Sequence, residues 1–319
     1  MTSQPLIDAD RLWSRLMALA EIGATPAGGV NRQALSDGEI AAWRRVIGWV
    51  GEAGLTPSTD AAGNLFLTLA GRDRKASPLL LGSHLDSQPT GGRFDGAAGV
   101  MAALEAVVSL ADQGGKPARD IIVVAWMNVE GSRFAPGMMG SDAFTGERDL
   151  ATIRVARDSN GISVGEALDR LHQAFPDLPH RPLGFAVGPI SNLRHPDNAM
   201  LDAAGVRITI LCKANASPCA VTATPLVDAP SNAFDARLQA GIAKAAHEQG
   251  HPALTMLSAA GHDARHLAKV STAAMIFIPC RDGASHVEHE WAEPDHVAAG
   301  ASVLAQVLRE LAFAPAIEG

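Results

Sequence analysis

The chain has 319 residues, of which 47% are hydrophobic and 19% charged, and this is enough apolar sequence for one large domain or one domain with a small appendage. Its formal net charge of −8 and its scattered Lys and Arg residues give no basic footprint, which argues against a nucleic acid partner. No apolar run reaches membrane-spanning length, and the first ten residues lack the basic start and apolar core of a signal peptide, so we expect a cytoplasmic protein.

Two helices and a pair of strands are expected first. Apolar residues recur at helical spacing over 10–21 and 36–53, and Ser36 with Glu39 offers a capping box for the second helix. Residues 55–69 have the pattern of a strand, a turn and a second strand.

An α/β pattern follows. The apolar runs 78–82 and 120–126 are typical of strands buried on both faces, and 96–113 between them is an apolar helix that can lie against a sheet. This order of strand, loop, helix and strand predicts an α/β domain.

The rest of the chain is less regular. Residues 176–189 are rich in proline and glycine, which break regular structure. The other expected elements are a helix over 150–171, a small hairpin from 207–213 and 220–227, a helix over 232–250, strands at 254–257 and 274–279, and a helix over 295–311.

Imidazoles and carboxylates follow the predicted strands. His84 and Asp86 come after the first buried strand, in a spacing that puts both side chains on one side, so Asp86 can orient the ring of His84. Asp95 lies in a glycine-flanked loop, Glu130 follows the second strand, and His286 lies near the C-terminus. Because the carboxyl ends of such strands face one crevice, we expect His84, Asp86 and Glu130 to converge there. Metal-assisted hydrolysis needs such ligands, an open coordination position and a general base.

Ordered motifs carry a family resemblance. They are Leu81–Val100, Asn128–Pro136, Gly140-Ser141, Ala260–Ala264 and Ser285-His286. Together they resemble the hydantoinase/carbamoylase branch of the M20 metallopeptidase-like hydrolases, which includes N-carbamoyl-L-amino acid hydrolases, allantoate amidohydrolases and β-ureidopropionases. The resemblance implies an M20-type catalytic domain with a mixed, mostly parallel sheet flanked by helices.

The resemblance also implies a metal site of one or two zinc or manganese ions. On the family pattern His84 would bind the first ion, Asp95 would bridge both, and Glu130 and His286 would bind the second. Asp86 would orient His84.

Two positions depart from the family pattern. The family has Asn-Glu-Glu-Gly where this chain has Asn-Val-Glu-Gly over 128–131, so Val129 stands in the place of the general base. The family histidine that completes the first ion's ligands is replaced by Gly184. His180 lies four residues upstream, about 13 Å along an extended strand, and His195 would have to return through a loop. The second ion position is therefore more complete than the first.

Four further polar residues are pocket candidates that spacing alone does not rank. They are His262, Asp263, Glu288 and Glu290. Each is also a candidate for a substitute general base or a substrate contact.

The lid domain of the family is reduced here. Residues 1–189 and 232–319 are predicted to form one discontinuous catalytic-type domain, and 190–231 leave space for a lid remnant only. The face exposed by a missing lid suits a partner protein.

Two functions remain open from the sequence. The first is a metal-dependent amidohydrolase that acts on a small carbamoyl, ureido or amide C–N bond with an altered site. The second is a catalytically silent homologue that acts as a partner subunit or a ligand-binding protein.

Overall fold

A computed structural model describes residues 6–51, 53–194, 232–258 and 260–313. The elements are α1 (Ala9–Ala20), α2 (Asp37–Gly51), β1 (Thr56–Thr59), β2 (Leu65–Leu69), β3 (Leu79–His84), α3 (Ala97–Asp112), β4 (Ile121–Trp126), α4 (Met139–Thr145), α5 (Leu150–Arg154), α6 (Val164–Ala174), β5 (Ile190–Arg194), α8 (Ala236–Glu248), α9 (Asp263–Leu267), β6 (Ala273–Phe277), the 3-10 turn η1 (Arg281–Gly283) and α10 (Pro294–Phe313).

The described strands form one six-stranded sheet in the order β1-β2-β4-β3-β5-β6. The strands β4, β3, β5 and β6 run parallel to one another, whereas β2 pairs antiparallel with β4 and β1 pairs antiparallel with β2. Parallel strands need a long crossover, and α3 provides it between β3 and β4. The predicted α/β class and the mixed, mostly parallel sheet are confirmed.

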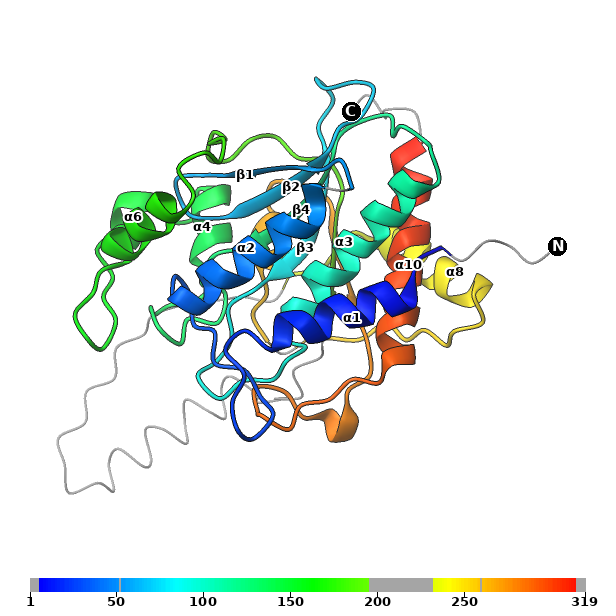
Figure 1. Cartoon of the computed structure of the whole chain (residues 1–319). Helices are drawn as coiled ribbons and strands as arrows, with labels where there is room; N and C mark the ends of the chain where they lie inside the picture. The colour runs from blue at the N-terminus through cyan, green and yellow to red at the C-terminus, as the bar shows by residue number, and fades with distance from the viewer. Residues whose placement is uncertain (1–5, 52, 195–231, 259, 314–319) are drawn as a thin grey trace.

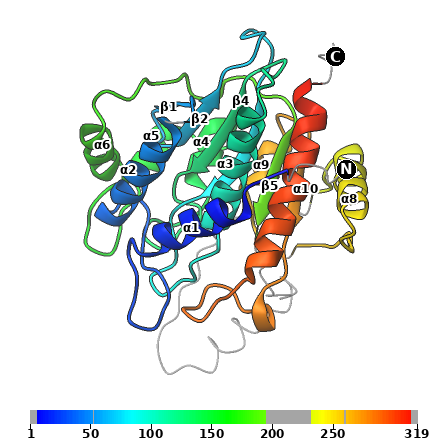
Figure 2. The ribbon, with the colours of Figure 1, turned by 45° about the vertical axis from the view of Figure 1, so that its right-hand side comes forward.

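Alternate residues of the central strands pack on opposite faces of the sheet. On β3, Leu79 and Leu81 belong to the core beneath α1, α2, α3 and α10, whereas Leu80 packs with Phe144 of α4 and Leu267 of α9. Figure 1 shows α1, α3 and α10 in front of the sheet and α4 behind it, and Figure 2 shows α9 on the same side as α4. Burial on both faces explains the continuous apolar sequence of β3 and β4.

Two predicted elements are wrong. The helix expected over 150–171 is divided into α5 and α6, because the carboxylate of Asp158 accepts hydrogen bonds from the N–H groups of Asn160 and Ile162 (2.9 and 3.0 Å) and forms a turn. The strand expected over 254–257 has no regular structure, and Leu254 is 86% exposed. Among the described strands, none pairs with residues 254–257.

The segment expected to be a lid remnant begins inside the sheet. β5 pairs with β3 on one side and β6 on the other. Residues 195–231, which contain the predicted hairpin and His195, lie outside the described residues. The division into a catalytic unit and a lid remnant therefore stays a prediction.

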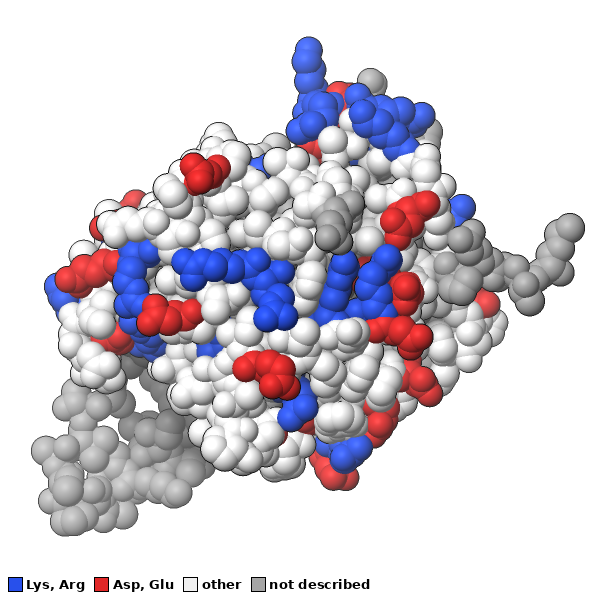
Figure 3. All heavy atoms as spheres, in the orientation of Figure 1, with Lys and Arg blue, Asp and Glu red and all other residues white. Residues whose placement is uncertain are grey.

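Within the described part of the chain, no helix is both long enough and apolar enough to cross a membrane. Basic and acidic side chains both occur on the face in Figure 3, with uncharged surface between them. That face shows no uniform basic surface of the kind that tracks a nucleic acid backbone.

Candidate metal centre

The ends of β3 and β4 place two of the predicted ligands side by side. His84 is the last residue of β3 and is paired in register with Trp126, the last residue of β4. Glu130 follows Trp126 in the loop after β4. The close approach of the strands requires Gly82, because a Cβ there would lie 2.0 Å from the carbonyl oxygen of Val124. The parallel register thus brings an imidazole and a carboxylate to one edge of the sheet.

A third predicted ligand, Asp95, comes from the loop before α3. The carboxylate of Glu290 accepts hydrogen bonds from the N–H groups of Phe94 and Asp95, both at 3.0 Å. The ring of Phe94 packs against Trp13 and Trp291, with ring centroids 5.8 and 5.5 Å away. Residues from the two ends of the sequence therefore fix the backbone that carries Asp95.

Four side chains converge at this edge. Nε2 of His84 lies 3.7 Å from Oδ1 of Asp95 and 3.7 Å from Oε1 of Glu130. One ligand atom from each of these three residues lies within 4.8 Å of the others. Nε2 of His286 lies 2.9 Å from Oδ2 of Asp95 and 3.5 Å from Oε2 of Glu130. The His84 side chain is 0% exposed and that of His286 is 41% exposed, so His286 closes the outer side of the cluster.

Asp86 connects two parts of the cluster. Its backbone carbonyl lies 2.9 Å, and its carboxylate 3.3 Å, from Nδ1 of His84. The same carboxylate accepts hydrogen bonds from the N–H groups of Val129 and Glu130, at 3.3 and 3.1 Å. With Nδ1 held in this way, Nε2 of His84 is directed toward Asp95 and Glu130, as in the outer hydrogen bonds of metal-bound histidines.

The electrostatics of the cluster favour a cation. Burial, together with the nearby Asp95, raises the pKa of Glu130 to about 8. Burial and the same Asp95 raise the pKa of Glu290 to about 7. Carboxylates held this closely away from water repel each other when ionised, and a bound metal ion reverses that penalty. Two imidazoles and two carboxylates are ligands suited to Zn²⁺ or Mn²⁺.

Gln88 also touches the cluster and was not foreseen from the sequence. Its side-chain amide donates a hydrogen bond to Oε2 of Glu130 at 2.5 Å. Gln88 lies two residues after Asp86, but no rule of sequence spacing identifies an amide that contacts a metal ligand.

The position at which the family pattern predicts a general base is apolar. Val129 is 7% exposed and packs with Trp126 and Phe144 in the core on the α4 side of the sheet. Gly184, at the position of the absent histidine, is exposed and has φ +71°. The ring of His180 packs against His172 at 4.8 Å, and His172 contacts the carbonyl of Asp60. His180 is therefore engaged beside β1 rather than at the metal cluster.

The remaining pocket candidates have other partners. Nε2 of His262 lies 2.7 Å from Oγ of Ser258, and Asp263 accepts a 2.7 Å hydrogen bond from Ser141. Glu288 accepts a 2.5 Å hydrogen bond from Thr25. Of the four candidates, Glu290 is the one that these contacts join to the cluster, through the backbone of Asp95.

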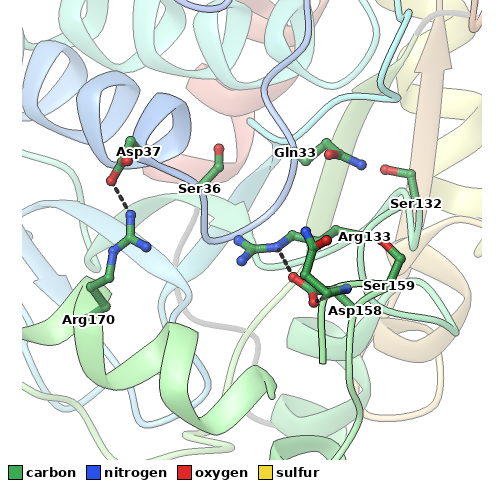
Figure 4. A pocket seen from close by; sticks show the side chains of 9 residues that line it. Gln33, Ser36, Asp37, Ser132, Arg133, Asp158, Ser159 and Arg170 are labelled. Atoms are coloured by element: carbon green, nitrogen blue, oxygen red, sulfur yellow. Dashed lines mark hydrogen bonds and ion pairs between the residues drawn. The ribbon is translucent and has the colours of Figure 1, made fainter. Parts of the chain in front are cut away.

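A polar cavity of about 330 Å³ lies beyond the Glu130 loop, and no cluster residue lines it (Figure 4). Its lining residues are Gln33, Ser36, Asp37, Ser132, Arg133, Asp158, Ser159, Asn160 and Arg170. Arg133 is bound to Asp158 at 3.0 Å, and Arg170 is bound to Asp37 across the opening. The first ion pair joins two loops, and the second joins α2 to α6.

Comparisons with known proteins agree with this geometry. Residues 80–310 match the family model described as Peptidase family M20/M25/M40. An N-carbamoyl-L-amino-acid amidohydrolase of Rhizobium meliloti is 31% identical over an alignment 405 positions long, which covers 96% of this chain and 97% of that protein. An allantoate amidohydrolase of Bacillus subtilis (strain 168) is 32% identical over 168 residues, covering 53% of this chain and 41% of that protein.

A solved structure is similar over its whole length. The crystal structure of a hydantoinase/carbamoylase family amidase from Burkholderia vietnamiensis matches 99% of this chain and 100% of that one, with a TM-score of 0.89 and 31% identity. The chain therefore belongs to the M20/M25/M40 peptidase family, and its structural neighbours are the hydantoinase/carbamoylase amidases.

Proposed function

We propose that this chain is a metal-dependent amidohydrolase that acts on a carbamoyl, ureido or amide C–N bond of a small molecule. The observation that carries the proposal is the convergence of His84, Asp95, Glu130 and His286 at the carboxyl edge of the sheet. The names of the relatives, an N-carbamoyl-L-amino-acid amidohydrolase and an allantoate amidohydrolase, supply the substrate class.

Three of the four side chains, those of His84, Asp95 and Glu130, offer ligand atoms close enough to one another for one ion. Zinc ligands at 2.0–2.1 Å in a tetrahedron lie about 3.3 Å from one another. Nε2 of His84 lies 3.7 Å from Oδ1 of Asp95 and from Oε1 of Glu130, whereas Nε2 of His286 approaches the other oxygen of each carboxylate, at 2.9 and 3.5 Å. We assign one or two Zn²⁺ or Mn²⁺ ions to these residues, and the first position is the less complete because Gly184 supplies no side chain for it.

Each residue then has a task. His84, Asp95, Glu130 and His286 would hold the metal, and Asp86 fixes the ring of His84 and the backbone of Glu130. When bound, the ion supplies Lewis-acid polarisation of the scissile carbonyl and lowers the pKa of water. Gln88 holds Glu130 through its amide and adjoins the reacting region.

Val129 limits the rate that this arrangement can reach. A positioned general base contributes a factor of about 10² to 10⁴, and Val129 has no proton acceptor. The same observation supports the second candidate function, a silent homologue that keeps the metal cluster and binds a ligand or partner protein. We also propose a cytoplasmic location for the chain. A protein partner would bind at the face beside the lid position.

Turnover separates the two candidates. The natural protein, loaded with Zn²⁺ or Mn²⁺, is assayed for ammonia release from N-carbamoyl amino acids and from allantoate. If the chain is an enzyme, the natural protein turns over substrate, loses turnover on chelation and regains it when metal is added. The His84→Ala variant is then expected to show no turnover. Metal binding without turnover of either substrate class would favour the silent homologue.

A further inference from the structure

Arg32 contacts both sides of Asp86. Its Nε donates to the carbonyl of Leu85 at 2.7 Å, and its backbone N–H donates to Oγ of Ser87 at 2.8 Å. The N–H of Ser87 donates in turn to the carbonyl of Arg32 at 2.9 Å. Arg32, from the loop before α2, therefore forms hydrogen bonds with the residues on either side of the aspartate that orients His84.

The other end of the guanidinium is anchored to α1. Nη1 donates to the carbonyls of Leu19 and Ile22, at 3.0 and 2.9 Å, where α1 ends. The last carbonyls of a helix lack partners within the helix and carry partial negative charge, so a cation is favoured there. Arg32 thus ties the loop after β3 to a rigid helix end.

Arg32 is also a buried charge, with 2% of its surface exposed. Burial lowers its pKa to about 10, while Glu39 and Asp86 act in the opposite direction, so the guanidinium stays charged near neutral pH. Asp86 is 1% exposed.

Asp86, which these contacts of Arg32 hold in place, contacts two of the proposed metal ligands. It contacts Nδ1 of His84 and accepts the N–H of Glu130. We propose that Arg32 is a positioning residue that sets the metal affinity of the centre, by holding residues 85–87 in place. This inference rests on the proposed metal site and names a residue that touches neither the ion nor the substrate.

The test is the affinity for metal alone. The purified full-length chain, stripped of metal, is titrated with Zn²⁺ against a chelating dye and with Co²⁺, followed by its visible absorption. Arg32→Gln is expected to lower the affinity by a factor of about 10 to 100, the usual cost of removing an outer hydrogen bond of a metal site. It is also expected to alter the Co²⁺ spectrum, because the ring of His84 shifts.

Arg11→Gln is the matched control. Arg11 also binds a buried carboxylate, that of Glu105, at 2.7 Å, but this contact joins α1 to the body of α3, away from the metal loops. The control is expected to lower the melting temperature while leaving the affinity per folded molecule and the Co²⁺ spectrum unchanged. An equal loss of affinity in Arg11→Gln and Arg32→Gln would show a general effect of stability and overturn the proposal.

Ser87→Ala decides the matter if Arg32→Gln does not fold. This change removes the acceptor for the Arg32 N–H and the hydroxyl's own hydrogen bonds to the carbonyls of Val30 and Gln88, and it spares the guanidinium. A measurable loss of metal affinity supports the proposal. Unchanged metal affinity in Ser87→Ala or in folded Arg32→Gln overturns the role of Arg32 but leaves the proposed function standing. Absence of metal binding by the natural chain would overturn the proposed function as well.

Discussion

Gly96 lies directly against the imidazole of His84. A Cβ added to Gly96 would lie 2.4 Å from Cε1 and 2.5 Å from both ring nitrogens, and Gly96 has φ +66°. We therefore expect Gly96→Ala to displace the ring and to lower metal affinity by at least a factor of about 10. The measurement is a Zn²⁺ titration of the folded variant.

The control for Gly96→Ala is Gly146→Ala. Gly146 has φ +76° at the end of α4, and an added Cβ there meets nothing within 4 Å. Both variants bear the backbone cost of a non-glycine residue at positive φ, about 1 kcal/mol or more. Natural metal affinity in both variants would contradict the placement of His84 in the centre.

Restoring a carboxylate at Val129 is expected to raise turnover at a cost in stability. If the family base is the missing part, Val129→Glu gains a factor of about 10² to 10⁴ in kcat. Because Val129 packs with Trp126 and Phe144, the new carboxylate lowers the free energy of unfolding by about 1–3 kcal/mol. Val129→Gln has nearly the same size without a base, so a similar rate gain in that variant would refute the explanation.

Removing the metal is expected to destabilise the protein. A ligand at 100 times its dissociation constant adds about 2.7 kcal/mol to the free energy of unfolding. The melting temperature should therefore be higher with Zn²⁺ than with a chelator, both for the natural chain and for Arg11→Gln. For His84→Ala the two melting temperatures should be the same. A metal-dependent shift that survives in His84→Ala would place the ion elsewhere.

Asp60 gives the fold a pH dependence that is independent of the metal. Burial raises its pKa from 3.8 to about 6, although it accepts hydrogen bonds from Ala62 and Asn64. The folded state thus binds the proton more tightly than the unfolded state. The stabilisation is complete below pH 3.8, falls as the pH rises, and is lost above about pH 6, with a total of about 3 kcal/mol.

Urea unfolding of the natural chain and Asp60→Asn between pH 4.5 and 7.5 isolates this contribution. The stability of the natural chain relative to the variant should fall as pH rises through this window. A difference that is independent of pH would mean that Asp60 titrates normally in the folded protein.

The regular elements around the site could be predicted because their signals are local. The apolar runs of β3 and β4 and the helical pattern of α3 each lie within one short segment, and the structure has all three. The turn at Asp158 was missed although Asp158, Asn160 and Gly161 are typical turn residues, because the apolar spacing on either side outweighed them.

The predicted ligands could be found from the ends of the strands and from the family resemblance. The residues that hold these ligands in place could not be found in this way. The hydrogen bonds from Phe94 and Asp95 to Glu290 join residues nearly two hundred positions apart. Arg32 and Gln88 act through contacts that exist only once β3, β4 and α1 are packed. Such contacts follow from tertiary structure, and one sequence carries no local pattern for them.

The most direct test of the central claim is anomalous X-ray diffraction at the zinc or manganese edge, from crystals of the natural chain prepared with excess metal. The account predicts an anomalous peak within coordination distance of Asp95 and Glu130 and of at least one of His84 and His286. A metal-replete protein with no peak among these four side chains would contradict it.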